Sequence, residues 1–74
     1  MPGTVAALGE PSLLAGFGLA GASVHAAETD DEVRRAWAAL QGDAAVVILT
    51  PRAAGVLGSV LADPHSPLTV VLPP

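Results

Sequence analysis

The sequence predicts a single α/β domain built on a parallel sheet, and three observations support that fold class. Strand-like and helix-like stretches alternate along all 74 residues. Residues 44–49 and 68–72 are apolar at nearly every position, which is typical of parallel strands covered on both faces. No stretch has the composition of a linker, so residues 1–74 form one domain with one modest core.

The first half of the chain predicts two strands separated by a helix. Residues 4–8 form an apolar run that ends at Gly9, as in a first strand. Pro11 favours the first turn of a helix, and Gly21 is placed to end it. The apolar positions of this helix are Leu13, Leu14, Phe17 and Leu19. Residues 22–26 predict a second, weaker strand.

The second helix has the clearest beginning. Thr29 and Glu32 have the spacing of a capping box, in which each side chain accepts a hydrogen bond from the other residue's backbone N–H. Asp30 and Asp31 favour the positive end of the helix dipole, and Arg35 lies one turn beyond Asp31. The residues expected to face the core are Val33, Ala36, Trp37 and Leu40.

The third helix follows the apolar strand at residues 44–49. Thr50 is placed as its N-cap and Pro51 as its first residue, and Pro64 ends it. Its apolar stripe consists of Ala53, Val56, Leu57, Val60 and Leu61. We therefore expect one continuous helix that reaches almost to Pro64.

The last strand, at residues 68–72, lies between Pro67 and Pro73, as expected near a sheet edge. Four strands joined by three helices through right-handed crossovers, with the first strand central, predict the strand order 2-1-3-4. The sequence therefore predicts a flavodoxin-like three-layer domain, with the first helix on one face and the other two on the opposite face.

The composition of the chain disfavours several classes of partner and several cellular compartments. Seven acidic residues against three arginines and no lysine give a formal net charge of −4, which disfavours nucleic-acid binding. Without cysteine the chain forms no disulfide. No apolar run approaches the ~18 residues of a membrane span, and Met1-Pro2-Gly3-Thr4 lacks the basic start of a secretory signal. We expect a cytoplasmic protein that does not insert into a membrane.

Glycines at 16, 18 and 21 match the dinucleotide pattern G-x-G-x-x-G. That site needs its glycines in the turn directly after a strand, whereas these fall at the end of a predicted helix. Close packing and helix termination are therefore favoured over nucleotide binding, and no cofactor is expected.

The residues needed for phosphotransfer and for metal binding are also absent from the expected positions. Phosphotransfer of the receiver-domain kind needs acidic residues after the first and third strands and a later lysine. Here the strands end at Gly9-Glu10 and Leu49-Thr50, and lysine is absent. His25 and His65 have no third ligand near them in sequence, so surface histidines are favoured over a metal site. The acidic residues are interpreted as solvated caps and turns, and no catalytic or metal-binding residue is expected.

Several of these segments, in this order and spacing, resemble the F subunit of the V-type and A-type rotary ATPases. The segments are Gly9-Glu10, Gly16-Phe17-x-Leu19-Ala20-Gly21, Ile48-Leu49-Thr50 and the closing stretch from Pro67 to Pro73. The matching motif positions are Gly9, Glu10, Gly16, Phe17, Leu19, Ala20, Gly21 and Thr50. Gly18 stands where the family usually has Arg or Lys.

The resemblance implies a non-catalytic central-stalk subunit that binds the rotor-shaft (D-type) subunit. It would couple ATP hydrolysis or synthesis to proton or sodium transport, peripheral to the membrane. The alternative is a stand-alone flavodoxin-like module that binds a protein or a small ligand.

Family members continue from the last strand into a C-terminal helix, whereas this sequence ends at Pro73-Pro74. We therefore expect half of one sheet face to be bare and to act as a docking surface. It would be covered by the shaft subunit in the complex and by a second copy, as a homodimer, in isolation. The candidate docking residues are Val46, Val47, Ile48, Leu49, Val70, Val71 and Leu72. Which alternate set points outward is left open, because strands that are apolar throughout have no two-residue period.

Overall fold

The computed structural model describes residues 4–40, 42 and 44–73. Its elements are β1 (Thr4–Gly9), α1 (Pro11–Leu19), β2 (Ser23–Ala26), α2 (Asp30–Leu40), β3 (Ala44–Leu49), α3 (Pro51–Leu57), the 3-10 helix η1 (Gly58–Ala62) and β4 (Leu68–Val71). All four strands are parallel, in the order β2-β1-β3-β4, which confirms the predicted sheet. The prediction that the N-terminus lacks a secretory signal depends on residues 1–3 as well as Thr4, and residues 1–3 lie outside the described residues.

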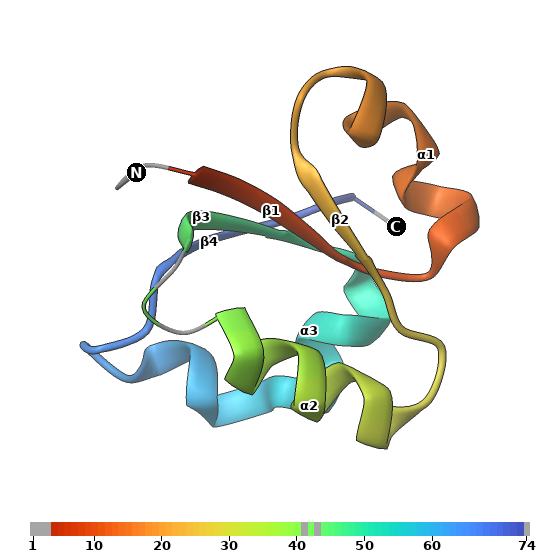
Figure 1. Ribbon diagram of the computed structural model, residues 1–74. Helices are drawn as coiled ribbons and strands as arrows, with labels where there is room; N and C mark the ends of the chain where they lie inside the picture. Colours follow the sequence, from red (N-terminus) through yellow and green to blue (C-terminus); the bar gives the residue numbers. More distant parts are fainter. Residues whose placement is uncertain (1–3, 41, 43, 74) are drawn as a thin grey trace.

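The helices lie on both faces of the sheet, as predicted. Figure 1 shows α1 above β2, and α2 and α3 together below the sheet. The chain crosses from β1 to β2 in one direction along the sheet, and from β2 to β3 and then β4 in the opposite direction. Because each crossover is right-handed, the reversal places α1 on one face and α2 and α3 on the other.

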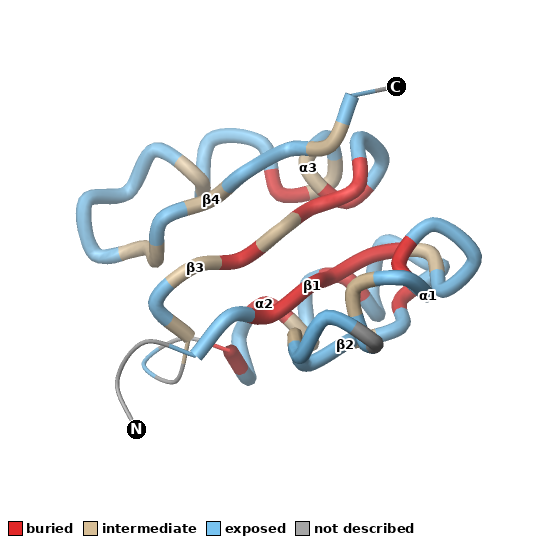
Figure 2. The backbone as a smooth tube through the Cα atoms, turned by 90° about the horizontal axis from the view of Figure 1, so that it is seen from above, coloured by how far each residue is buried: buried red, intermediate tan, exposed pale blue. Residues whose placement is uncertain are grey.

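The hydrophobic core lies between the sheet and the layer of α2 and α3. Its buried residues come from β1, β3 and these two helices, with Ala27 from the segment between β2 and α2, and Figure 2 shows those of β1 and β3 as red stretches. The core residues are Ala6, Leu8, Ala27, Val33, Trp37, Leu40, Val47, Leu49, Ala53 and Leu57. Val33, Trp37 and Leu40 were predicted to face the core, and their burial confirms the orientation of α2.

The ends of the first two helices also follow the sequence signals. Gly21 has φ +98°, and the N–H groups of Gly21 and Ala22 donate to the carbonyls of Gly18 and Phe17 at 3.2 and 3.0 Å. This pair of bonds is a Schellman motif with Gly21 at the left-handed position, as predicted.

At the start of α2 the capping box is formed. The Glu32 N–H donates to Thr29 Oγ1 at 3.1 Å, and Glu32 Oε1 accepts from the N–H groups of Thr29 at 3.3 Å and Glu28 at 2.8 Å. One turn further, Arg35 pairs with Asp31 at 2.8 Å. The local signals therefore predicted both the helix start and its ion pair.

The prediction of one continuous helix up to Pro64 is wrong. The α-helix ends at Leu57, and Gly58, with φ +54°, starts the 3-10 helix η1. A 3-10 helix has three residues per turn, so the apolar stripe loses its α-helical phase. Val60, predicted to face the core, is 43% exposed as a result.

Candidate functional site

The carboxyl ends of β1 and β3 form the point at which the chain leaves the sheet toward opposite faces. After β1 it enters α1 on one face, and after β3 it enters α3 on the other. In open α/β sheets, ligands and active sites concentrate at such a switch point. Three of the predicted motif positions, Gly9, Glu10 and Thr50, meet here.

Thr50 is the central residue of this group and is fully buried. Its hydroxyl donates to Glu10 Oε1 at 2.6 Å and accepts from the Ala53 N–H at 3.3 Å, as the N-cap of α3. Its backbone N–H donates to the Leu8 carbonyl at 3.2 Å. One residue thus connects the end of β1 to the first turn of α3.

Gly9 makes room for this connection. A Cβ atom built on Gly9 would overlap the side chain of Thr50, and the backbone there has φ +149°. A residue larger than glycine is therefore excluded by close approach as well as by conformation. We call Gly9, Glu10 and Thr50 the switch-point joint.

The interpretation of the acidic residues as solvated caps and turns is incomplete for Glu10, which occupies the N-cap position of α1 but is bonded to Thr50. The side chain of Glu10 is half-buried. No local pattern marks Glu10 and Thr50 as a pair, because they meet only when β1 and β3 are neighbours. The predicted strand order contained this information, since each residue directly follows one of these two strands.

The electrostatics of the joint do not favour acid–base chemistry. The hydrogen bond from Thr50 lowers the pKa of Glu10, with smaller help from the charge of Arg52, while burial opposes the shift. A general acid at neutral pH needs a raised pKa instead. Glu10 is therefore held ionised as a hydrogen-bond acceptor.

The glycine-rich segment of α1 lies at the C-terminal end of the helix. The N–H groups of Gly21 and Ala22 are used in the Schellman motif, and the positive end of the helix dipole is at the opposite terminus. The segment lacks the geometry of a phosphate-binding turn. Next to it, Phe17, Val5 and Ile48 line part of an open hollow of about 390 Å³.

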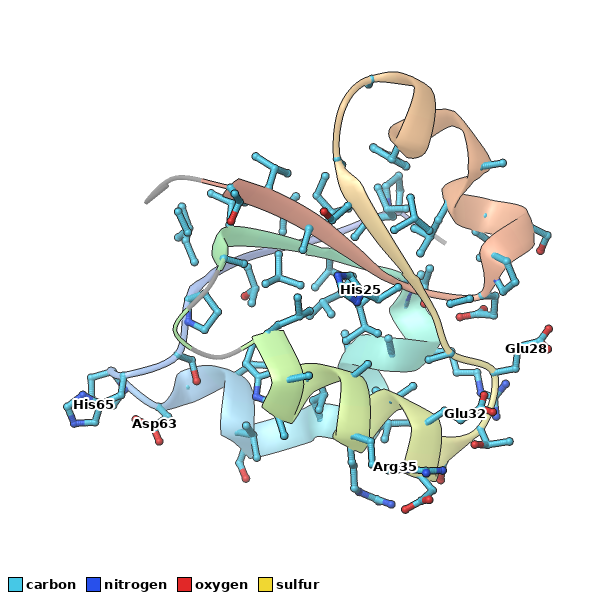
Figure 3. All side chains as sticks on the ribbon, in the orientation of Figure 1. His25, Glu28, Glu32, Arg35, Asp63 and His65 are labelled. Atoms are coloured by element: carbon cyan, nitrogen blue, oxygen red, sulfur yellow. The ribbon has the colours of Figure 1, made fainter. Side chains whose placement is uncertain are left out.

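The two histidines lie far apart (Figure 3), His25 on β2 and His65 in the turn before β4. The backbone N–H of His65 donates to Asp63 Oδ1 at 2.9 Å, which stabilises that exposed turn. Within the described part of the chain, no group of three or more His, Cys, Asp or Glu side chains is placed to hold a metal ion.

A second candidate site is the part of the sheet that α1 leaves uncovered. On β3, Val47 and Leu49 face α2 and α3 and are fully buried, whereas Val46 and Ile48 face the α1 side and are only partly buried. The register pairs Val46 with Leu68 and Ile48 with Val70 of β4. We call the side chains of Val46, Ile48, Leu68 and Val70 the bare strip.

The bare strip answers the question of orientation that the sequence left open. Leu68 is 68% exposed and Val70 is 50% exposed, and no described helix lies over β3 and β4 on this side (Figures 1 and 2). Of the other candidate docking residues, Val47 and Leu49 belong to the core. Val71 is exposed on the opposite face, and Leu72 follows the end of β4, where its N–H donates to the Leu49 carbonyl at 2.9 Å.

The expectation that half of one sheet face is bare holds within the described residues. β3 is covered by helices on the α2 and α3 side only, and β4 is exposed along most of its length. The physical reason is that α1 packs on β1 and β2 and does not reach the other half of the sheet.

The strand order, the parallel pairing and the helices on both faces define a flavodoxin-like α/β domain. Compared with known protein families and with curated proteins, the chain has no match. No helix within the described residues has both the length and the hydrophobicity needed to cross a membrane.

Proposed function

We propose that this chain is a non-catalytic central-stalk subunit of a V-type or A-type rotary ATPase. The supporting observation is the switch-point joint. Gly9, Glu10 and Thr50 lie on two segments 40 residues apart, yet they form one hydrogen-bonded unit with a close backbone approach. Three of the eight motif positions that resemble the family therefore act together, as expected if these three specify one structural feature.

Two further features support docking rather than catalysis. The one half-buried carboxylate of the joint, Glu10, already accepts a short hydrogen bond from Thr50 and has a lowered pKa. The bare strip offers apolar side chains that gain free energy when a partner covers them. A cytoplasmic location, peripheral to the membrane, and binding to the rotor-shaft subunit are part of this proposal.

The test is purification of the tagged chain from native membranes under mild detergent. We expect the shaft subunit and the catalytic subunits of a rotary ATPase to co-purify in stoichiometric amounts, identified by mass spectrometry. A Gly9→Val variant serves as control, because it disrupts the joint and should reduce the yield of the complex. Recovery of a folded chain without any rotary ATPase subunit would contradict the proposal.

The alternative function is a stand-alone module for a small apolar ligand. The hollow bordered by Phe17, Val5 and Ile48 favours it, because its lining combines an aromatic ring with aliphatic side chains. The same purification distinguishes the two functions, because no ATPase subunit would co-purify with a stand-alone module.

A further inference from the structure

The helix α1 has an unusual composition for its position. Its sequence, PSLLAGFGL, contains no charged residue. Leu14 is fully buried against the sheet, but Leu13 is 51% exposed. A helix that is apolar all round is normally buried on all sides. The outer face of α1 therefore has the character of a surface that is covered by something else.

The bare strip beside α1 has the same character. β3 and β4 contain no charged residue, and their side chains on the α1 side are Val46, Ile48, Leu68 and Val70. The opposite face of the sheet carries two helices, α2 and α3, whereas this face carries α1 alone among the described helices (Figure 1). No helix of the described part of the chain therefore covers the strip.

We propose that a second copy of this chain covers both surfaces, in a two-fold symmetric dimer in which α1 of each copy lies on the bare strip of the other. The proposal goes beyond the function proposed above and does not depend on it. A shaft subunit bound at the same surface would replace the second copy.

The geometry of the sheet permits this arrangement. The strand order places α1 over the β2–β1 half and the bare strip on the β3–β4 half. A two-fold axis that runs parallel to the strands, in the plane of the helix layer, brings the β3–β4 half of one sheet over α1 of the other. Both contacts then form at once, because an isologous interface repeats each contact on the other side of the axis.

Dimensions agree with one helix on each strip. Two neighbouring strands span roughly 10 Å and four residues of a strand about 13 Å. A helix is about 10 Å wide, and the nine residues of α1 extend about 13 Å at 1.5 Å per residue. The uncovered area and the exposed helix therefore have similar size.

The absence of charge from both surfaces allows two copies to approach, and the small area of contact limits their affinity. Both surfaces are uncharged, so the net charge of −4 on each copy is kept out of the interface. A flat surface could not reach the strip, because α1 stands beside it. Each copy contributes two helix-wide patches, an area below the ~800 Å² per partner of a standard interface. We therefore expect a weak dimer with a dissociation constant in the micromolar range.

The test is analytical ultracentrifugation of the purified 74-residue chain across the micromolar range. We expect a reversible monomer–dimer equilibrium. Leu13→Glu on α1 and Val70→Glu on the strip should each raise the dissociation constant by at least about tenfold, or 1.4 kcal/mol. Val71→Glu is the matched control, because Val71 is 47% exposed on the same strand but faces the other side. It should change the constant by less than about twofold.

A mixing experiment tests the pairing of α1 with the strip. The Leu13→Glu variant and the Val70→Arg variant should each be monomeric by itself, but an equimolar mixture of the two should form a heterodimer. One of its contacts then joins the new glutamate to the new arginine, and the other is unchanged. Failure of the mixture to associate would overturn the arrangement.

Other outcomes are also decisive. A chain that stays monomeric at the highest concentrations would overturn the proposal. An effect of Val71→Glu as large as that of Val70→Glu would point to edge-to-edge pairing of β4 and overturn it as well. Circular dichroism checks the fold of each variant, and Val70→Thr with Val71→Thr gives a milder matched pair if a glutamate prevents folding.

Discussion

The hydroxyl of Thr50 lies 2.6 Å from the carboxylate of Glu10 and donates a hydrogen bond to it across 40 residues of sequence. The same hydroxyl oxygen accepts from the Ala53 N–H. One side chain thus joins the end of β1, the end of β3 and the first turn of α3. Thr50 is fully buried, and its bond from the Ala53 N–H is buried as well, whereas Glu10 is only half-buried.

Thr50→Val should therefore destabilise the domain by about 1–2 kcal/mol, through loss of the N-cap and of the bond to Glu10. Valine keeps the shape of threonine, so the change isolates the hydroxyl. Urea unfolding followed by circular dichroism measures the effect. Thr50→Ser retains the hydroxyl and should recover most of the loss, and equal stability of the valine variant and the original chain would show that the joint is not stabilising.

The stability of the domain should decrease in acid. The pKa of Glu10 is lowered by the bond from Thr50, and that of Glu32 is lowered by the N–H groups of Glu28 and Thr29. Both folded pKa values lie below the ordinary value of 4.5, so the unfolded chain binds these protons first as the pH falls. The stabilisation is complete above that value and is lost as the pH falls through the folded pKa.

Unfolding curves across this acidic range measure the effect. Glu10→Gln and Glu32→Gln should each flatten the pH dependence, because each removes one titrating group. If the double variant kept the full acid sensitivity, other groups would be responsible.

Gly9→Ala should destabilise the domain by about 1–3 kcal/mol, as overpacking does. The added methyl group would overlap the side chain of Thr50, whose position is fixed by its two hydrogen bonds. The matched control is Gly16→Ala, because nothing lies within 4 Å of a Cβ built there. In that helical position alanine should stabilise by about 0.5–1 kcal/mol. Thermal unfolding of both variants checks the opposite signs.

The features that the sequence predicted correctly depend on residues close together in the chain. The capping box of Thr29 and Glu32 spans three residues, and the Schellman motif at Gly21 spans one helix end. Their geometry is fixed locally, so residue type and spacing are sufficient. The strand order also followed, because crossover handedness leaves few topologies.

The features that the sequence did not predict depend on tertiary structure. The bond between Glu10 and Thr50 exists only because β1 and β3 are neighbours. The break at Gly58 was missed because a single glycine inside a helical pattern can stay helical or end the helix. Strands 44–49 and 68–72 are apolar on both faces, so their pattern could not tell which side chains belong to the core.

The last prediction concerns Trp37, the largest side chain of the core, which is 3% exposed on the inner face of α2. Trp37→Ala should cost about 3–5 kcal/mol, a large part of the total stability of a domain this small. Its Nε1–H is buried without a hydrogen-bond partner among the described residues. Trp37→Phe should therefore cost much less, because phenylalanine keeps most of the packing and removes an N–H whose desolvation is not compensated. Chemical unfolding of both variants beside an exposed control, Arg34→Ala, measures the difference. Equal losses for Trp37→Phe and Trp37→Ala would show that the indole N–H, rather than the volume of the ring, stabilises the core.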